Sequence, residues 1–461
     1  MRIQAVLILT VFLNPATAAP PNVLLLVSDD QRSDTIHALG NSIIQTPSLD
    51  QLVASGSSFT RATCANPICT PSRAEILTGC CGFRCGVMDF GKPIHSKTPT
   101  LARWFAKFGY TASYVGKWHN DGRPVERGYA FTRGLYRGGG GRFARPMVDF
   151  AGRPTTGYTG WIFQDDEGQL FPGMGVGLTS EISQYFADAA IEVIRTADQK
   201  PFFLHVNFTA PHDPLILPKK WINAYQPEDM RLPENFLPRH PFNHGNFDGR
   251  DERLFKWPRT PGETRRELAA YYAVISHMDE QIGRILEALD ASGKSDNTIV
   301  VFASDHGLGV GSHGLRGKQN MYEHTIGVPL IFRGPGVPKG ELFDAQCYLR
   351  DLFATLCDLT GIESPGASID SRSLVPVLNG KSRAVHPFIV GYFRNMQRMI
   401  RTNQWKYIEY PEAKQIQLFQ LSSDPYEKNN LANDEEQRQV REQLQELMQQ
   451  WFRAQGDAVY Q

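Results

Sequence analysis

Short apolar runs alternate with longer segments of helical periodicity along most of the chain. The runs predict buried strands at 22–27, 112–115, 202–208, 298–303 and 328–332. Two segments, 180–196 and 263–291, predict helices. In the second helix, apolar side chains recur at steps of three, four and seven residues and form one face: Leu268, Tyr272, Ile275, Ile282, Leu286 and Leu289. This alternation predicts an α/β fold with a doubly wound, mostly parallel sheet flanked by helices.

The pattern changes after about residue 380. Short strands separated by tight turns are predicted at 398–402, 404–410 and 416–421, and a charged helix follows at 434–454. We therefore predict a main domain over 20–380 and a smaller C-terminal α+β subdomain over 381–461. Within the main domain, 128–177 and 227–261 lack helical periodicity, and loops of that length are more often functional than decorative.

The N-terminus has the pattern of a secretory signal peptide. Met1 and Arg2 precede an apolar stretch, and Ala16-Thr17-Ala18 resembles a cleavage site, so residues 1–19 are predicted to be removed on export. The alternative is an N-terminal core strand. Export implies a periplasmic or secreted protein, or a lysosomal one in a eukaryote. No apolar run reaches the ~18 residues of a membrane span, so we expect no stable membrane insertion.

Composition narrows the classes of partner. The 461 residues are 41% hydrophobic, and 48 basic side chains balance 48 acidic ones, which argues against a nucleic-acid-binding protein. An anionic ligand must therefore meet a local positive site. The seven cysteines leave one over in an exported protein; if Cys69 is that one, the others allow about 15 disulfide pairings. The sequon at Asn207 lies in a predicted strand, so we expect it to be buried rather than glycosylated.

Reactive residues follow four of the predicted strands. Ligands of open α/β sheets bind at the carboxyl ends of the strands, so four such endings favour a site over four ordinary turns. The residues concerned are Asp29 and Asp30, Lys117 and His119, His212, and Asp305 and His306. Three carboxylates around one point suit Ca²⁺ or Mg²⁺, whereas the histidine leaves Mn²⁺ or Zn²⁺ open. Trp118, Tyr110 and His205 are expected to be packing residues.

The segment Cys69-Thr70-Pro71-Ser72-Arg73 is the sharpest local signal. It opens a predicted helix over 72–78, with the proline near the first turn. A helix N-terminus offers unpaired N–H groups to an anion, and Arg73 adds a forked cation. The alternative is that Cys69 is a disulfide partner.

Several motifs together resemble the sulfatase family. The cysteine segment with Leu77-Thr78-Gly79 is similar to the family signature, and 109–119 is similar to its second motif. Further matches, in order and spacing, are Asp29-Asp30, Pro211-His212, Asp305-His306-Gly307, Gly311 to Lys318, 328–331, and the C-terminal segments at 418–421, 424–425 and 430–431. Many members have glutamate where Ser312 stands, so we assign no role to His313.

The resemblance implies an alkaline-phosphatase-like fold and a specific chemistry. A separate maturation enzyme would oxidise Cys69 to formylglycine, and the hydrated aldehyde would attack the sulfate ester. One divalent cation per chain, usually Ca²⁺, would be held by Asp29, Asp30, Cys69, Asp305 and His306. The family implies roles for further residues: Asp305 as base, Arg73 and Lys117 holding charge, His119 accepting the proton for sulfate release, and His212 and Lys318 at the leaving oxygen.

The implied function is hydrolysis of a sulfated small molecule or glycan. The insertion at 128–177 holds residues suited to a sulfated sugar ring: Arg137, Arg142, Phe143, Arg145, Tyr158, Trp161 and Phe163. Its alternative is an ordinary lid. Choline sulfate and aryl sulfates remain open as substrates. The rival functions are a phosphatase or phosphodiesterase of the same superfamily, and a non-catalytic calcium-dependent glycan-binding protein.

Overall fold

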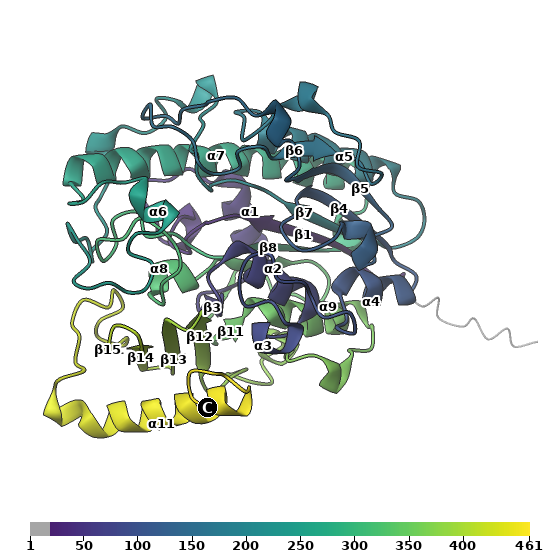
Figure 1. The fold of residues 1–461 in the computed structure, drawn as a ribbon. Coiled ribbons are helices and arrows are strands. Elements are labelled where there is room, and N and C mark those ends of the chain that lie inside the picture. The colour runs from purple at the N-terminus through teal and green to yellow at the C-terminus, as the bar shows by residue number, and fades with distance from the viewer. Residues whose placement is uncertain (1–18) are drawn as a thin grey trace, which may run out of the picture.

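The computed structural model describes residues 19–461, so the predicted signal peptide lies almost wholly outside the described residues. None of the helices in this part of the chain combines the length and the apolar character needed to cross a bilayer. Figure 1 shows a large helix-flanked sheet with a smaller C-terminal unit below it.

A nine-stranded sheet forms the centre of the main domain, in the order β10-β2-β9-β8-β1-β7-β4-β5-β6. Strands β8, β1, β7, β4 and β5 pair in parallel, whereas β9 and β6 run antiparallel to their neighbours. The predicted doubly wound, mostly parallel sheet is therefore confirmed. The strands are β1 (Asn22–Ser28), β2 (Ser57–Phe59), β4 (Thr111–Lys117), β5 (Phe131–Arg137), β6 (Ile162–Gln164), β7 (Phe202–Asn207), β8 (Thr298–Ser304), β9 (Leu330–Arg333) and β10 (Glu341–Phe343).

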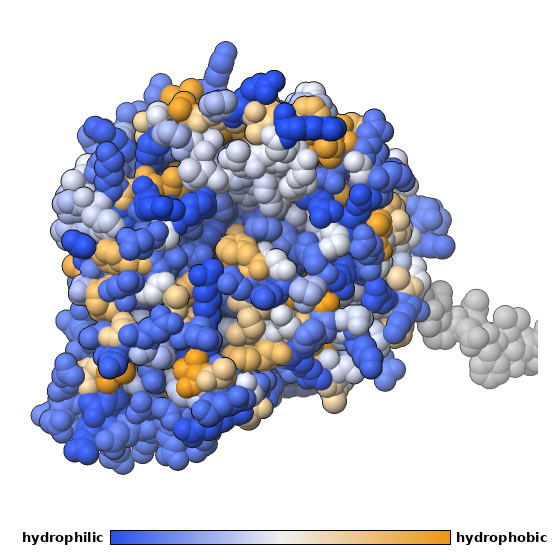
Figure 2. Space-filling model, in the orientation of Figure 1, coloured by the Kyte–Doolittle hydropathy of each residue, from blue (hydrophilic) through white to orange (hydrophobic). Residues whose placement is uncertain are grey.

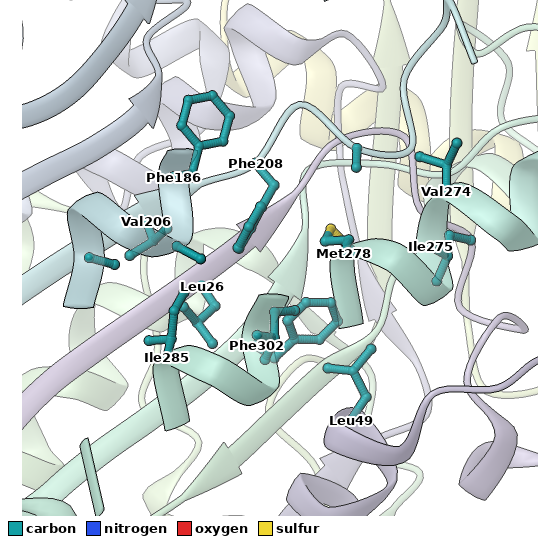
Figure 3. Packing of buried hydrophobic residues seen from close by; sticks show 14 of the residues in the cluster. Leu26, Leu49, Phe186, Val206, Phe208, Val274, Ile275, Met278, Ile285 and Phe302 are labelled. Carbon is teal, nitrogen blue, oxygen red and sulfur yellow. The ribbon is translucent and has the colours of Figure 1, made fainter. Parts of the chain in front are cut away.

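Helices cover both faces of this sheet. On one face lie α1 (Pro47–Ser55), α5 (Ile182–Thr196) and α7 (Pro261–Ala291), and on the other lie α2 (Cys69–Thr78), α4 (Leu101–Lys107) and α9 (Leu352–Thr360). Leu24 and Leu26 of β1 pack in the first layer, and Val23, Leu25 and Val27 pack in the second. Burial on both faces explains why the central strands are continuous apolar runs. Figure 3 shows Leu26, Val206 and Phe302 meeting the helices of the first layer.

The short elements connect these layers. They comprise β3 (Ala62–Thr63), which pairs with β11 (Cys347–Tyr348), and the helices α3 (Gly82–Cys85), α6 (Arg250–Arg253), α8 (Glu323–Ile326) and α10 (Val375–Leu378). Strands β5 and β6 were not predicted, because they lie at the edge of the sheet. In β5, buried and partly exposed residues mix in the segment Phe131-Thr-Arg-Gly-Leu-Tyr-Arg, so it has no apolar run.

The C-terminal unit is the predicted α+β subdomain. An antiparallel sheet runs in chain order through β12 (Ile389–Phe393), β13 (Gln397–Arg401), β14 (Trp405–Tyr410) and β15 (Gln415–Gln420). Helix α11 (Arg438–Ala454) buries Leu444, Met448 and Phe452 against this sheet. Figure 2 shows its outer side as hydrophilic, at the lower left. The first strand, β12, was not predicted, and the boundary at residue 380 stays a prediction.

Several predicted core positions are buried. Asn207 on β7 is 2% exposed, which matches the expectation for the sequon. His205 lies in the same strand, and its Nδ1 is 2.8 Å from the Tyr129 hydroxyl. Trp118 and Tyr110 are also buried. All seven cysteines are buried and unpaired in this structure, so it selects none of the possible disulfides.

Four buried histidines, His240, His244, His313 and His324, lie near Tyr322 between the main domain and the C-terminal sheet. The His313 ring stacks on Tyr322 with centroids 3.8 Å apart. Burial lowers the pKa of His240 to about 4 and of His313 to about 3, and it holds the pKa of His324 well below its usual value.

These histidines should make the fold sensitive to acid. A histidine with a pKa of ~6.5 in the unfolded chain is protonated there as the pH falls below that value. If the same histidine stays neutral in the folded protein, the free energy of unfolding decreases over that pH range and is unaffected above it. For His324 this loss amounts to about 2 kcal/mol at pH 5. The difference in the free energy of unfolding between His324→Gln and the wild type should therefore be smaller at pH 5 than at pH 7. The expected change in this difference is about 2 kcal/mol. Denaturant unfolding at both pH values measures the difference, and His95→Gln, at an exposed position, is the control. Equal differences at the two pH values would contradict the assignment.

Candidate active site

The four strands with reactive endings are neighbours in the sheet. They lie in the order β8-β1-β7-β4, and their parallel pairing brings their carboxyl ends to one edge. Asp29 and Asp30 follow β1, Asp305 and His306 follow β8, and Lys117 ends β4. All five side chains are fully buried. The convergence expected from the sequence is therefore present.

Cys69 lies at this same edge. It is the first residue of α2, so the helix begins earlier than the predicted residue 72. Its Sγ is 3.3 Å from Nζ of Lys318 and 3.4 Å from Nε2 of His306. Ser72, one turn on, donates a hydrogen bond of 2.6 Å to the Asp305 carbonyl, which fixes the helix against the end of β8.

Cys69 differs chemically from the other cysteines. Burial would raise the pKa of its thiol, but Lys117, Lys318 and His306 outweigh burial and hold that pKa well below the usual value. Burial raises the pKa of each of the other thiols: Cys64, Cys80, Cys81, Cys85, Cys347 and Cys357. A lowered pKa marks a reactive cysteine, whereas a raised one marks an inert thiol.

The acidic residues at this edge of the sheet form a candidate cation site. Ligand atoms of Asp29, Cys69, Asp305 and His306 all lie within 4.8 Å of one another, and so do those of Asp30, Cys69 and His212. Asp29 Oδ1 is buried and accepts no hydrogen bond in the described part of the chain. Buried carboxylates need a compensating charge, and oxygen donors suit a hard divalent ion. The residues present therefore fit a divalent cation.

Three buried cationic side chains lie against these carboxylates. Lys117 Nζ is 2.6 Å from Asp29 Oδ2, and Lys318 Nζ is 2.8 and 3.0 Å from the two oxygens of Asp30. Arg73 Nη2 bridges Asp29 and Asp305 at 3.3 and 3.0 Å. Burial raises the pKa of Asp29, but Lys117 together with Arg73 holds it below its usual range. Burial prevails at Asp305, whose pKa rises to about 6 although Arg73 opposes the shift.

The histidines of the site differ in their proton affinity. Burial lowers the pKa of His119 to about 4. Burial also disfavours charged His306 and His212, but the carboxylates outweigh it: Asp305 and Asp30 raise the pKa of His306 to about 9, and Asp30 raises that of His212. The carboxylates thus favour a proton on His306 and His212, whereas His119 is neutral near pH 7.

A pocket of about 360 Å³ opens above Cys69. Of the seven residues proposed for a sugar ring, Tyr158 and Trp161 line it. The other five do not: Arg137, Arg142, Phe143 and Arg145 lie elsewhere on the insertion, and Phe163 is in the core. Composition alone therefore did not show which of the seven reach the site, because the insertion folds partly into β6 and presents only one short turn to the pocket.

Sequence reasoning missed several residues of the site. Asn207 accepts a hydrogen bond from Arg73 at the end of β7, a position the strand-end rule could have found. Tyr158 donates one to Asp29, and its ring packs 4.8 Å from that of His212. The pocket wall also includes Phe90, Asn246, Arg250, Asp251, Gln319 and Arg394, which follow no motif. His313, given no role, lies outside the wall.

The chain resembles known proteins over nearly its whole length. The sulfatase family model matches residues 21–362, and the model of the N-sulphoglucosamine sulphohydrolase C-terminal region matches 311–454. An arylsulfatase of Clostridium perfringens is 31% identical over 455 residues, with 93% of each chain covered. An ulvan-active sulfatase of Formosa agariphila is 28% identical and covers 89% of this chain and 77% of its own. A phosphonate monoester hydrolase structure from Silicibacter pomeroyi superposes with a TM-score of 0.77 at 22% identity, covering 95% and 96% of the two chains.

Proposed function

Since the chain belongs to the sulfatase family and is therefore a sulfuric ester hydrolase, we propose that it releases sulfate from a sulfated carbohydrate with a nucleophile derived from Cys69. The observation that carries this proposal is the position of Cys69, whose Sγ lies within 3.4 Å of both Lys318 and His306 at the edge of the acidic cluster. In the proposal, Sγ stands in for the oxygens of formylglycine.

We assign the cation to Asp29, Asp30, Asp305 and His306 together with residue 69, with Ca²⁺ as the expected ion. When bound, the cation would act as a Lewis acid that neutralises sulfate oxygens and activates the nucleophile. Formylglycine would supply a hydrated aldehyde, which carries two hydroxyl groups where serine has one.

The remaining residues would stabilise charge and move protons. Arg73 and Lys117 surround Asp29 and would hold the developing negative charge, an effect worth ~3 kcal/mol for a single donor. Asp305, with its raised pKa, would accept the proton of the attacking hydroxyl. His212 and Lys318 line the pocket, and the Asp30 carboxylate raises the pKa of both, so they would donate to the leaving oxygen. His119, neutral, would then accept the proton whose removal releases sulfate.

The carbohydrate assignment rests on the pocket and on the relatives. Its wall combines aromatic rings with amide and charged groups, the usual equipment for a sugar ring. The similarity to an ulvan-active sulfatase also favours a carbohydrate substrate. The predicted signal peptide would place the enzyme where extracellular glycans are found.

Mass spectrometry tests the proposed nucleophile directly. In protein produced with a maturation enzyme, the peptide containing Cys69 should be ~18 Da lighter than encoded. An active enzyme whose Cys69 remains a thiol would contradict the proposal. Turnover of 4-nitrophenyl sulfate should exceed that of 4-nitrophenyl phosphate and of choline sulfate. A preference for the phosphate would instead favour the phosphatase function.

Tyr158 provides a further test of the site. Removal of its hydroxyl in Tyr158→Phe should lower kcat about tenfold, because loss of one hydrogen bond to a charged group costs ~1.5 kcal/mol. KM should change little, since the hydroxyl contacts Asp29 rather than open pocket. Steady-state kinetics on 4-nitrophenyl sulfate measure both constants. A rise in KM with kcat unchanged would show that Tyr158 acts on the substrate instead.

A further inference from the structure

We propose that the substrate carries a second anionic group, a carboxylate or another sulfate, and that Arg394 of the C-terminal subdomain binds it. The inference rests on the proposed function, because it names the class of saccharide that the same pocket would take. Arg394 lies in the turn between β12 and β13, and it lines the pocket that also contains Cys69. Among the described lining residues, it alone comes from beyond residue 380.

The charge of Arg394 is available to a ligand. Its Nε lies 2.8 Å and its Nη2 3.2 Å from the carboxylate of Asp89, and Nη1 has no protein partner within residues 19–461. The side chain is 39% exposed. A guanidinium group presents paired N–H donors that match the oxygens of a carboxylate or a sulfate.

The other cationic side chains that line the pocket already contact carboxylates. Arg250 contacts two carboxylates, those of Asp213 and Asp251, which neutralise it. Lys318 contacts Asp30 and Cys69, and His212 lies against Asp30, so both belong to the reaction centre that would meet the first sulfate. Arg394 faces a single carboxylate and keeps Nη1 unpaired among the described residues, so it offers a donor that the first sulfate does not use.

The backbone at Arg394 also indicates a ligand site. Its φ of 44° lies in the left-handed region, which is costly for a residue with a side chain. Eight non-glycine residues of the described chain have positive φ, and four of them, Asp30, Tyr158, Gln319 and Arg394, are at this site. Strain of this kind persists where the surrounding structure enforces it, and it clusters at ligand-binding positions.

An aromatic wall borders the pocket that Arg394 also lines. Phe90, which directly follows Asp89, is 41% exposed, and its ring centroid lies 5.6 Å from that of His119. Trp161 continues this wall at 5.0 Å from His119. A ring packed on these aromatic groups, with its sulfate at Cys69, would direct another substituent across the pocket. Because the pocket holds only about 360 Å³, that substituent belongs to the same ring or to the next one.

Binding to a Cys69→Ala protein tests the inference without turnover. The probes are a monosulfated neutral disaccharide, a monosulfated disaccharide that contains a uronic acid, and a disulfated disaccharide. Arg394→Gln should lower the affinity for at least one doubly charged probe tenfold more than for the neutral one, and the probe that loses more identifies the second group. Arg394→Lys, which keeps the charge without the fork, should lose less. Arg145→Gln, which removes an exposed arginine outside the pocket, should change none of the three.

Equal losses for all three probes, or none, in an Arg394→Gln protein with an unchanged melting temperature would overturn the inference. If Arg394→Gln unfolds, the lysine variant decides: a loss of affinity confined to a doubly charged probe supports the inference, whereas equal losses for all three probes, or none, overturn it. Failure of the matured wild type to release sulfate from any of the three probes or from 4-nitrophenyl sulfate would contradict the proposed function instead, and the binding result would stand separately.

Discussion

Replacement of Cys69 by serine is expected to lower steady-state sulfate release roughly a thousandfold or more. A serine hydroxyl can attack once, but the resulting sulfate ester has no second hydroxyl on the same carbon from which sulfate could be eliminated. Release would then depend on water. The expected signature is a single burst of the alcohol product, stoichiometric with the enzyme, followed by almost no turnover.

Cys64→Ser is the matched control for this variant. Cys64 is also buried, and its Sγ is 3.2 Å from the Asn66 carbonyl, which a serine hydroxyl could reach. It does not line the pocket. We expect its turnover to stay within about threefold of the wild type. Sustained turnover by Cys69→Ser, measured as sulfate released per enzyme over many cycles, would refute the mechanism.

The sequence predicted the reaction centre better than the substrate wall, and the reason is physical. Asp29, Lys117 and Asp305 follow central strands whose two faces are both buried. Such strands are continuous apolar runs, and their parallel pairing forces their carboxyl ends together. An alternation of strand and helix is therefore enough to bring these side chains to one edge without knowledge of any long-range contact.

The substrate wall follows from contacts that no local pattern encodes. Arg394 is held by Asp89, far away in the chain, and Asn246 is hydrogen-bonded to Gln319. Strand β5, next to the edge strand β6, alternates irregularly, so the course of the insertion after it could not be predicted from periodicity. The seven residues of that insertion were therefore singled out by composition alone, and of these seven only Tyr158 and Trp161 line the pocket.

Removal of the divalent cation is expected to lower sulfate release more than a hundredfold, with recovery when Ca²⁺ is added back. Asp29, Asp30 and Asp305 are completely buried, and their attraction for a doubly charged ion is little screened by solvent. A chelator should also destabilise the fold. An ion present at 100 times its Kd stabilises the protein by about 2.7 kcal/mol, so the melting temperature of a chain of this length should fall by ~3 °C.

The variant Asp29→Asn separates cation binding from a general effect of the chelator. Because this change removes one carboxylate and leaves a side chain of the same shape, it should abolish the shift in melting temperature that Ca²⁺ produces. Glu280→Gln, a partly exposed position on α7, should leave the shift unchanged. Titration with Mg²⁺, Mn²⁺ and Zn²⁺ would then rank the ions, since the histidine at this site favours the softer ones and the three carboxylates the harder. A wild-type enzyme that keeps full activity and the same melting temperature after exhaustive chelation would show that the buried lysines and Arg73 alone neutralise the acidic cluster.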